Sequence, residues 1–412
     1  MTAATATTGL PTLLLPSADG APRSYRLSAP GEWTRPTAPI TSRNVYAAAH
    51  VVPRMDAENT PGSPADLDWD ATLAYRHELW SYGLGVADAM DTAQRGMGLD
   101  WTATRELIRR SAAEAAAVVA ERRPELEGKS VRDLVSCGAG TDQLDPAGIT
   151  PGADGLRAVA DAYLEQLAVV EESGAKVILM CSRALARAAS TPQDYLDVYG
   201  RLLREASRPV VLHWLGTMFD PALAGYWGSE DTAAATATFL DLIRDHAEKV
   251  DGVKVSLLDA GHEVELRAQL PAGVRLYTGD DFNYPELIHG DGTHHSDALL
   301  GIFAAIYPAA STALQAYDAG DAERGRAILT STQDLGRQIF AAPTYYYKTG
   351  VAFLSWLNGH QSGFQLVGGL HAGRSLPHLV RVFTLADQAG LLLDPELAAR
   401  RMGALLETGG AA

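Results

Sequence analysis

The sequence predicts a (β/α)₈ barrel with an N-terminal extension and a C-terminal helical layer. From residue 44 onward, short β-rich runs alternate with longer segments of helical periodicity, as in a parallel sheet with crossover helices. Chemically reactive residues stand where several of these runs end, which is typical of the active face of a barrel. No Gly-x-Gly-x-x-Gly follows the first run, so nothing favours an open dinucleotide-binding sheet. We expect three regions: 1–43, 44–308 and 309–412.

The first region is rich in Thr, Ala and Pro. Two short extended pieces, 11–16 and 23–27, predict a small hairpin that plugs or flanks the main domain.

The barrel is predicted from eight strands: 45–52, 83–87, 133–137, 176–181, 209–214, 252–258, 274–278 and a weaker one at 292–298. Helical periodicity fills the intervals at 101–121, 155–173, 194–206 and 231–250. After about residue 309 only helices are expected: 312–319, 322–340, 345–357, 376–389 and 395–406.

Lys254 is the most informative residue, because it sits within a predicted strand. Strand side chains alternate, and both faces of a parallel barrel are covered, so this amine loses hydration. Desolvation lowers the pKa of a lysine and produces a nucleophilic amine near neutral pH. Lys176 opens its strand, and Lys348 follows three tyrosines on a C-terminal helix, so both are less suited. The alternative is a structural lysine paired with Asp259 or Asp280.

Two segments around this lysine carry a family resemblance. The run 250–254, Val-Asp-Gly-Val-Lys, and the run 278–281, Thr-Gly-Asp-Asp, resemble the sixth and seventh strands of the dihydrodipicolinate synthase/N-acetylneuraminate lyase group. Glycines at 290–292 and the helical segment 317–327 extend the match to roughly 45–360. The chain resembles a divergent, domain-of-unknown-function branch of that superfamily. The resemblance implies class I aldolase chemistry, in which Lys254 forms an imine.

The second-strand loop departs from the family. Where the family reads Gly-Thr-Thr-Gly-Glu and cradles a carboxylate, this chain reads Met-Asp-Thr-Ala-Gln-Arg-Gly at 90–96. We take Asp91, Thr92 and Arg95 as substrate-binding candidates. Asp91 would repel a carboxylate, and Arg95 could compensate.

The resemblance also supplies the second catalytic residue. His213 falls where the family has a proton-shuttling tyrosine, and a histidine can do general acid/base work near pH 7. We predict Lys254 and His213 as the catalytic pair, with Asp280 and His295 among the substrate-binding residues. No cofactor is expected.

A metal site is the alternative chemistry. Histidines gather in the run 289–297, and His50, Asp88 and Asp91 follow other strands. Adjacent His294 and His295 would point to opposite sides of a strand, however, and no His-x-His motif is present. We therefore assign no metal ligand.

Composition limits the partners. Asp and Glu number 50 against 34 Lys and Arg, giving a net charge of −16 that repels phosphate backbones. We therefore expect no nucleic acid partner. We also expect no membrane partner, because no apolar stretch approaches the roughly 20 residues that span a bilayer. The N-terminus lacks a basic signal start, so the cytoplasm is the expected location. Cys137 and Cys181 are expected to be buried, reduced thiols.

The sequence therefore predicts an imine-forming lyase or aldolase acting on a small oxo-acid or sugar-derived carbonyl compound. A metal-dependent barrel lyase or isomerase and a non-catalytic barrel that binds a small ligand stay open as alternatives. The family resemblance and the aromatic helix at 345–356 favour a homodimer or tetramer.

Overall fold

The computed structural model describes residues 9–17 and 21–411. Eight parallel strands close into a barrel in the order β10-β3-β4-β5-β6-β7-β8-β9, which confirms the predicted fold class. They are β3 (Val45–Ala48), β4 (Gly85–Asp88), β5 (Val135–Ala139), β6 (Lys176–Leu179), β7 (Val210–Leu215), β8 (Val250–Ser256), β9 (Arg275–Thr278) and β10 (Asp297–Leu300). The eighth strand starts five residues later than predicted, and the segment before it is a loop.

Helices alternate with the strands around the barrel. They include α1 (Trp69–Ser81), α2 (Trp101–Glu121), α3 (Val131–Leu134), α4 (Ala153–Ser173), α5 (Arg183–Ala188), α6 (Pro192–Glu205), α7 (Thr232–Asp245), α8 (Ala260–Arg267), α9 (Tyr284–His289) and α10 (Ile302–Asp318). The predicted helix 101–121 coincides with α2. Its start is fixed by Asp100, whose carboxylate accepts the backbone N–H of Ala103 at 2.9 Å.

The interior of the barrel is a packed core with a polar base. Nine buried side chains form its apolar cluster: Tyr46, Ala48, Ala87, Met90, Ile178, Met180, Val211, Tyr277 and Leu299. At the N-terminal ends of the strands, Lys176 forms an ion pair with Asp251 at 3.3 Å. The Tyr277 hydroxyl donates to the same carboxylate at 2.8 Å. The base of the barrel is therefore closed, and chemistry is confined to the opposite end.

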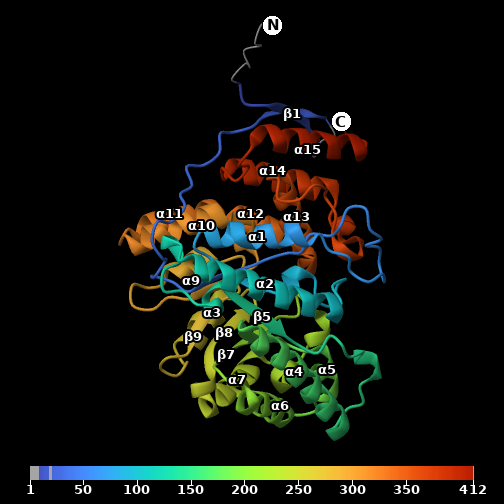
Figure 1. Cartoon of the computed structure of the whole chain (residues 1–412), viewed down its shortest axis with the longest axis vertical. Coiled ribbons are helices and arrows are strands. Elements are labelled where there is room, and N and C mark those ends of the chain that lie inside the picture. Colours follow the sequence, from blue (N-terminus) through green and yellow to red (C-terminus); the bar gives the residue numbers. More distant parts are fainter. Residues whose placement is uncertain (1–8, 18–20, 412) are drawn as a thin grey trace.

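The C-terminal helices form a layer at one end of the molecule (Figure 1). They are α11 (Ala322–Ser331), α12 (Gln333–Ile339), α13 (Tyr347–Leu357), α14 (Leu376–Gln388) and α15 (Pro395–Thr408). The predicted helix 322–340 is interrupted at Thr332. Helix α10 follows the eighth strand, is kinked at Ile306 and continues across residues 308 and 309, so the predicted boundary between barrel and layer falls inside a helix.

The predicted N-terminal hairpin is present as β1 (Thr12–Leu15) and β2 (Arg23–Arg26), which pair antiparallel. It lies on the C-terminal layer, beside α15, and away from the barrel (Figure 1). The Tyr25 ring packs edge-on against Phe383, with centroids 6.5 Å apart, and its hydroxyl donates to buried Asp387 at 2.7 Å. The extension therefore covers the outer helices and does not enter the barrel mouth.

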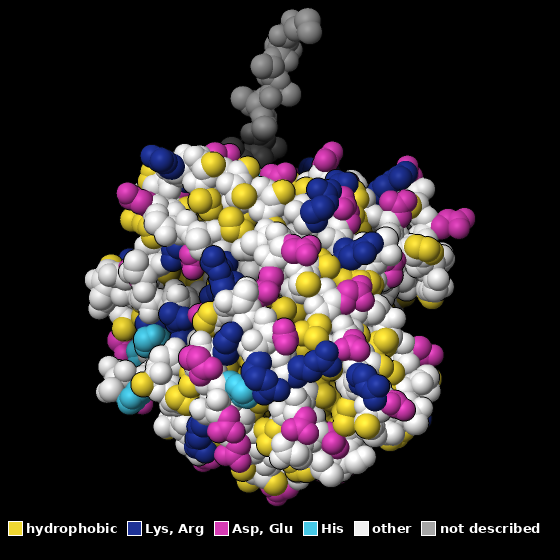
Figure 2. All heavy atoms as spheres, turned by 60° about the horizontal axis from the view of Figure 1, so that its bottom comes forward, with side chains coloured by type: hydrophobic (Ala, Val, Ile, Leu, Met, Phe, Trp, Pro, Cys, Tyr) yellow, Lys and Arg dark blue, Asp and Glu magenta, His cyan; other side chains and the backbone are white. Residues whose placement is uncertain are grey.

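Acidic and basic side chains are interspersed on the face seen in Figure 2, with apolar side chains scattered between them. None of the helices in the described ranges has the length and apolar character needed to cross a bilayer. Both cysteines are free thiols. Cys137 is buried in β5, and Cys181 donates a hydrogen bond to the His213 carbonyl at 3.1 Å.

Candidate active site

Lys254 lies on β8, the sixth strand of the barrel, and its side chain faces the interior. It pairs in register with His213 of β7, whereas its neighbours Val253 and Val255 belong to the core between barrel and helices. Lys254 is only 8% exposed. Burial lowers the pKa of the Lys254 amine, and the nearby carboxylates of Asp91 and Asp281 oppose that shift.

The chain has five lysines, and Lys254 differs from the other four in the hydrogen bonds and ion pairs of its amine. Lys129 and Lys249 donate to backbone carbonyls, and Lys176 is paired with Asp251. Lys348 donates to the Tyr345 carbonyl at 3.1 Å. The Lys254 amine makes no hydrogen bond or ion pair with any residue in the described ranges, so neither Asp259 nor Asp280 holds it.

The Thr-Gly-Asp-Asp segment after β9 makes room for this lysine. A Cβ on Gly279 would lie 2.2 Å from Ser256 Oγ and 2.9 Å from Lys254 Cε, so a side chain at this position would displace the amine. Asp280, predicted as a substrate-binding residue, makes no ion pair with Lys254 in the described chain. Its carboxylate accepts the N–H groups of Phe282 and Asn283 at 2.9 and 3.0 Å and stabilises the turn.

Asp281, the next residue, acts on the charge of Lys254 together with Asp91. It is buried, and its Oδ1 accepts the backbone N–H of Ile302 at 2.7 Å. Burial raises the pKa of Asp281 to about 7, and Lys254 partly opposes this shift. The site therefore holds a carboxyl that exchanges its proton near neutral pH.

His213 lies beside Lys254 in the same layer of the interior and is 1% exposed. Its Nε2 is 3.2 Å from Ser256 Oγ, whereas its Nδ1 has no hydrogen-bond partner within the described part of the chain. Burial holds the pKa of His213 well below its usual range, and the charge of Lys254 adds to this shift. The resting imidazole is therefore neutral.

The loop after β4 brings Asp91 and Thr92 to the barrel mouth. Ala89, at the start of this loop, has φ of 51°, a left-handed conformation that costs a non-glycine residue energy. Thr92 is buried, and its hydroxyl is 2.8 Å from the hydroxyl of Tyr347 on α13. The C-terminal layer thus touches the loop that carries Asp91.

Arg95, in the same loop, is committed to structure. Its five N–H donors are used by the Asp142 carboxylate, the Gln166 amide oxygen and the carbonyls of Ala89 and Gly138. The Arg95 side chain in the ion pair with Asp142 is 2% exposed. Arg95 is therefore not available to offset the charge of Asp91 toward a substrate, contrary to the sequence-based expectation.

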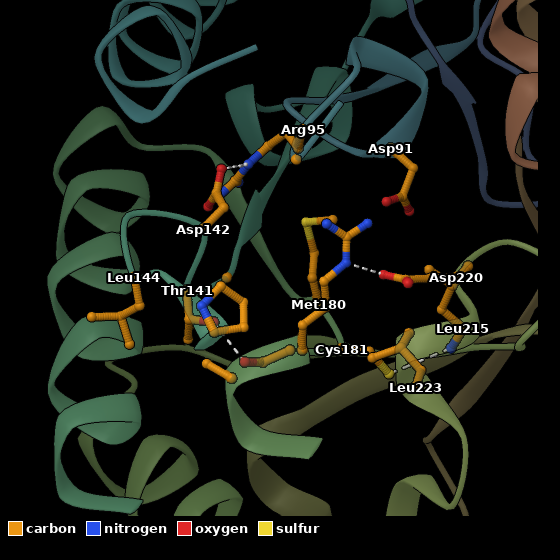
Figure 3. A pocket seen from close by; sticks show the side chains of 16 residues that line it. Asp91, Arg95, Thr141, Asp142, Leu144, Met180, Cys181, Leu215, Asp220 and Leu223 are labelled. Carbon is orange, nitrogen blue, oxygen red and sulfur yellow. Dashed lines mark hydrogen bonds and ion pairs between the residues drawn. The ribbon is translucent and has the colours of Figure 1, made fainter. Parts of the chain in front are cut away.

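A cavity of about 280 Å³ opens at the mouth, between the loops that follow β4, β5, β6 and β7. Among its lining residues are Asp91, Met180, Arg183, Leu215 and Asp220. Figure 3 shows the Asp91 carboxylate pointing into this space, apart from the bonded pair of Arg95 and Asp142. Asp91 also acts on the charge of Lys254, although Lys254, His213 and Asp281 are not among the residues that line this cavity.

His295 is wrongly placed by the sequence analysis. It is an exposed loop residue before β10, and therefore at the N-terminal ends of the strands, opposite the mouth. His295 was predicted as a site residue because we expected a strand at 292–298. In the structure this strand, β10, begins at Asp297. The polarity of a parallel barrel puts such a residue outside the site.

The side chains considered as possible metal ligands lie apart from one another. Asp88 forms a buried ion pair with Arg76 at 2.8 Å, and His50 Nε2 is 3.0 Å from the Gln361 side chain. Within residues 9–17 and 21–411, no three His, Cys, Asp or Glu side chains are grouped as metal ligands.

Three residues near the mouth were not predicted as site residues: Arg183, Tyr347 and Lys348. The last two lie on α13, which is about 90 residues beyond Lys254 in the chain. Arg183 follows directly on β6, and the rule that reactive residues gather at strand ends singles it out. No local pattern marks Tyr347 and Lys348, because only the packing of α13 brings them to the barrel.

The fold and these contacts define a TIM barrel with a buried, unbonded lysine on its sixth strand. Residues 13–411 match the family described as "Protein of unknown function (DUF993)", and the chain belongs to that family. No curated protein matches the chain.

Solved dihydrodipicolinate synthases share the fold. The enzyme from Aquifex aeolicus is 12% identical, covers 85% of this chain and 99% of its own, and gives a TM-score of 0.59. A putative synthetase from Pseudomonas aeruginosa is 15% identical over 84% and 99%, with a TM-score of 0.58. A monomeric dihydrodipicolinate synthase variant is 15% identical over 86% and 99%, also with a TM-score of 0.58. The chain thus has the barrel fold of these enzymes, as predicted.

Proposed function

We propose that this protein is an imine-forming lyase or aldolase that acts on a small oxo-acid or sugar-derived carbonyl compound, with Lys254 as nucleophile. The observation that carries this proposal is the Lys254 amine, which is buried inside the barrel and bonded to no described residue. A desolvated amine is neutral in a larger fraction of molecules, and the neutral amine is the form that attacks a carbonyl.

In the proposed reaction, the amine nitrogen attacks the substrate carbonyl carbon and a C–N bond forms. The carbonyl oxygen takes up two protons, one that the attacking nitrogen loses and one from an acid in the site, and leaves as water, which produces a protonated imine. This imine withdraws electrons from the adjacent carbon, so that a C–C bond there can break or form. Hydrolysis then returns the free amine.

His213 and Asp281 are the groups we assign to proton transfer. His213 is neutral at rest and has one ring nitrogen without a described partner, so it can accept a proton from the nitrogen of the intermediate. Asp281, with its pKa raised to about 7, can supply a proton to the leaving oxygen. The two groups divide the acid and base roles around Lys254.

Borohydride trapping tests this proposal. The protein is incubated with a panel of oxo-acids and hydroxyaldehydes, reduced, digested and examined by mass spectrometry. We expect one adduct, on Lys254, that is lost in Lys254→Ala and kept in Lys249→Ala, a lysine remote from the mouth. His213→Ala should slow turnover about 10²–10⁴-fold. Full turnover by a folded Lys254→Ala protein, or an adduct on a different lysine, would contradict the proposal.

Location in the cytoplasm stays a prediction. The two free thiols are consistent with it.

Burial raises the pKa of Cys181 to about 12, so this thiol stays protonated and is a poor nucleophile.

A further inference from the structure

Lys348 is the third buried lysine, and it lies on α13 beside the barrel mouth. It is 3% exposed, and its amine donates only to the Tyr345 carbonyl at 3.1 Å and the Met97 sulfur at 3.4 Å. No carboxylate of the described chain pairs with it. A lysine ammonium has three donors and is costly to bury without an anion. Lys348 is therefore held at the mouth with unused capacity for a negatively charged partner.

Arg183 is a second cation with unused donors. It lines the cavity, and its Nε donates to Asp220. Its two terminal nitrogens make no hydrogen bond to any residue within 9–17 and 21–411. An arginine held through Nε presents the edge formed by its terminal nitrogens, which matches the two oxygens of a carboxylate.

The turn at Gly96–Met97 brings the two cations together. A Cβ on Gly96 would lie 3.3 Å from a terminal nitrogen of Arg183, and the sulfur of the next residue contacts the Lys348 amine. Arg183 also lowers the pKa of Lys348 through charge repulsion, after the larger effect of burial. The two positive groups thus flank one short stretch of backbone beside the cavity.

We propose that Arg183 and Lys348 form a subsite for a carboxylate on the substrate, at the end remote from the carbonyl that Lys254 attacks. The inference rests on the proposed function for the role of Lys254 and narrows the substrate class to acidic carbonyl compounds. Neutral sugar-derived compounds would leave the terminal nitrogens of Arg183 and the Lys348 amine without an anionic partner. The subsite takes the place of Arg95, whose donors are all engaged.

The charges around the subsite favour a carboxylate over a phosphate. Asp220 is bonded to Arg183, and Asp91 points into the same cavity. Both carboxylates repel an incoming anion, and a doubly charged phosphate suffers more from this than a singly charged carboxylate. The planar edge of Arg183 also suits a carboxylate.

Calorimetric binding of 2-oxoglutarate tests the subsite separately from the imine. All measurements use a Lys254→Ala background, in which no imine forms. Arg183→Ala and Lys348→Met should each weaken binding at least about tenfold, as expected for the loss of a charged hydrogen bond. Arg187→Ala, an exposed residue on the same helix as Arg183, and Lys249→Met, which removes a carbonyl-bonded lysine elsewhere, are the matched controls and should bind as before.

The outcomes are distinct. Unchanged affinity in both subsite variants, or no detectable binding of 2-oxoglutarate in the Lys254→Ala background, would overturn the subsite. Tighter binding of inorganic phosphate or of neutral glyceraldehyde than of 2-oxoglutarate would also overturn it. Loss of binding in the two subsite variants alone would support it, even if borohydride trapping on the native protein fails. Lys348→Met should unfold at the native temperature or above, because it removes a buried charge.

Discussion

Lys176 and Lys254 lie inside the same barrel, yet their surroundings lead to different chemistry. Lys176 is 7% exposed and is neutralised by Asp251 at the closed base. Lys254 is as deeply buried but has no bonded partner in the described chain. The difference comes from the neighbouring strands, because Gly279 clears space for Lys254 and Asp281 approaches without bonding to it. Burial is therefore common to both lysines, and the missing partner is what makes Lys254 the candidate nucleophile.

Glu263 is a buried carboxyl outside the site, and it should set part of the pH dependence of stability. It accepts the hydroxyls of Thr278 and Ser296 at 2.9 and 2.8 Å, and burial raises its pKa to about 8. Because the folded state holds this proton more tightly, stability falls as pH rises from about 4.5 to about 8. Glu263→Gln should flatten the melting temperature across that window. Glu265→Gln, exposed on the same helix, is the control, and an equal decline in both variants would contradict the assignment.

At the scale of single elements, the loop after β4 does most to shape the mouth. Arg95 joins it to β5 through the Gly138 carbonyl at 2.7 Å and to α4 through Gln166. The sequence marked this loop as part of the site but assigned Arg95 to the substrate. Sequence spacing places a residue near a strand end, and it does not show whether local acceptors have already used its donors.

Arg95→Met should therefore act on stability. Removing Arg95 leaves Asp142 without its positive partner, although Asp142 still accepts from the Gln166 amide, and we expect the free energy of unfolding to fall by about 3 kcal/mol. Urea denaturation measures this loss, with Arg105→Met, exposed on α2, as the control. A variant of native stability with weakened substrate binding would return Arg95 to the binding site.

At the scale of the whole molecule, the C-terminal layer belongs to the site. We expected the aromatic helix at 345–356 to provide a subunit interface. The structure buries Tyr347, Val351, Phe353 and Leu354 of α13 within one chain, so these side chains are not available to a partner. Large apolar side chains exposed on the described surface are few: Leu10, Leu14, Met218 and Val264. Self-association stays a prediction that now depends on the family resemblance alone.

Activity should nevertheless be independent of self-association. The proposed site is complete in a single copy, because one chain supplies all of its residues: Lys254, His213, Asp281, Asp91 and Lys348. We expect sedimentation velocity at micromolar concentration to show a dimer or tetramer, and specific activity to stay constant when dilution dissociates it. A species of 43.8 kDa at micromolar concentration would refute the oligomer. Activity lost on dilution would show that a partner contributes to the site.

The sequence by itself determined the barrel, seven of its eight strands to within a few residues, and the place of Lys254 on the sixth. These features follow from local periodicity and from the polarity of parallel strands, both of which are encoded over short stretches. Only the tertiary structure decided which carboxyls act on the lysine, which arginine keeps unbonded terminal nitrogens and that α13 packs against the loop after β4. Those outcomes depend on contacts between residues far apart in the chain, such as Thr92 with Tyr347 and Met97 with Lys348, and local spacing carries no information about them.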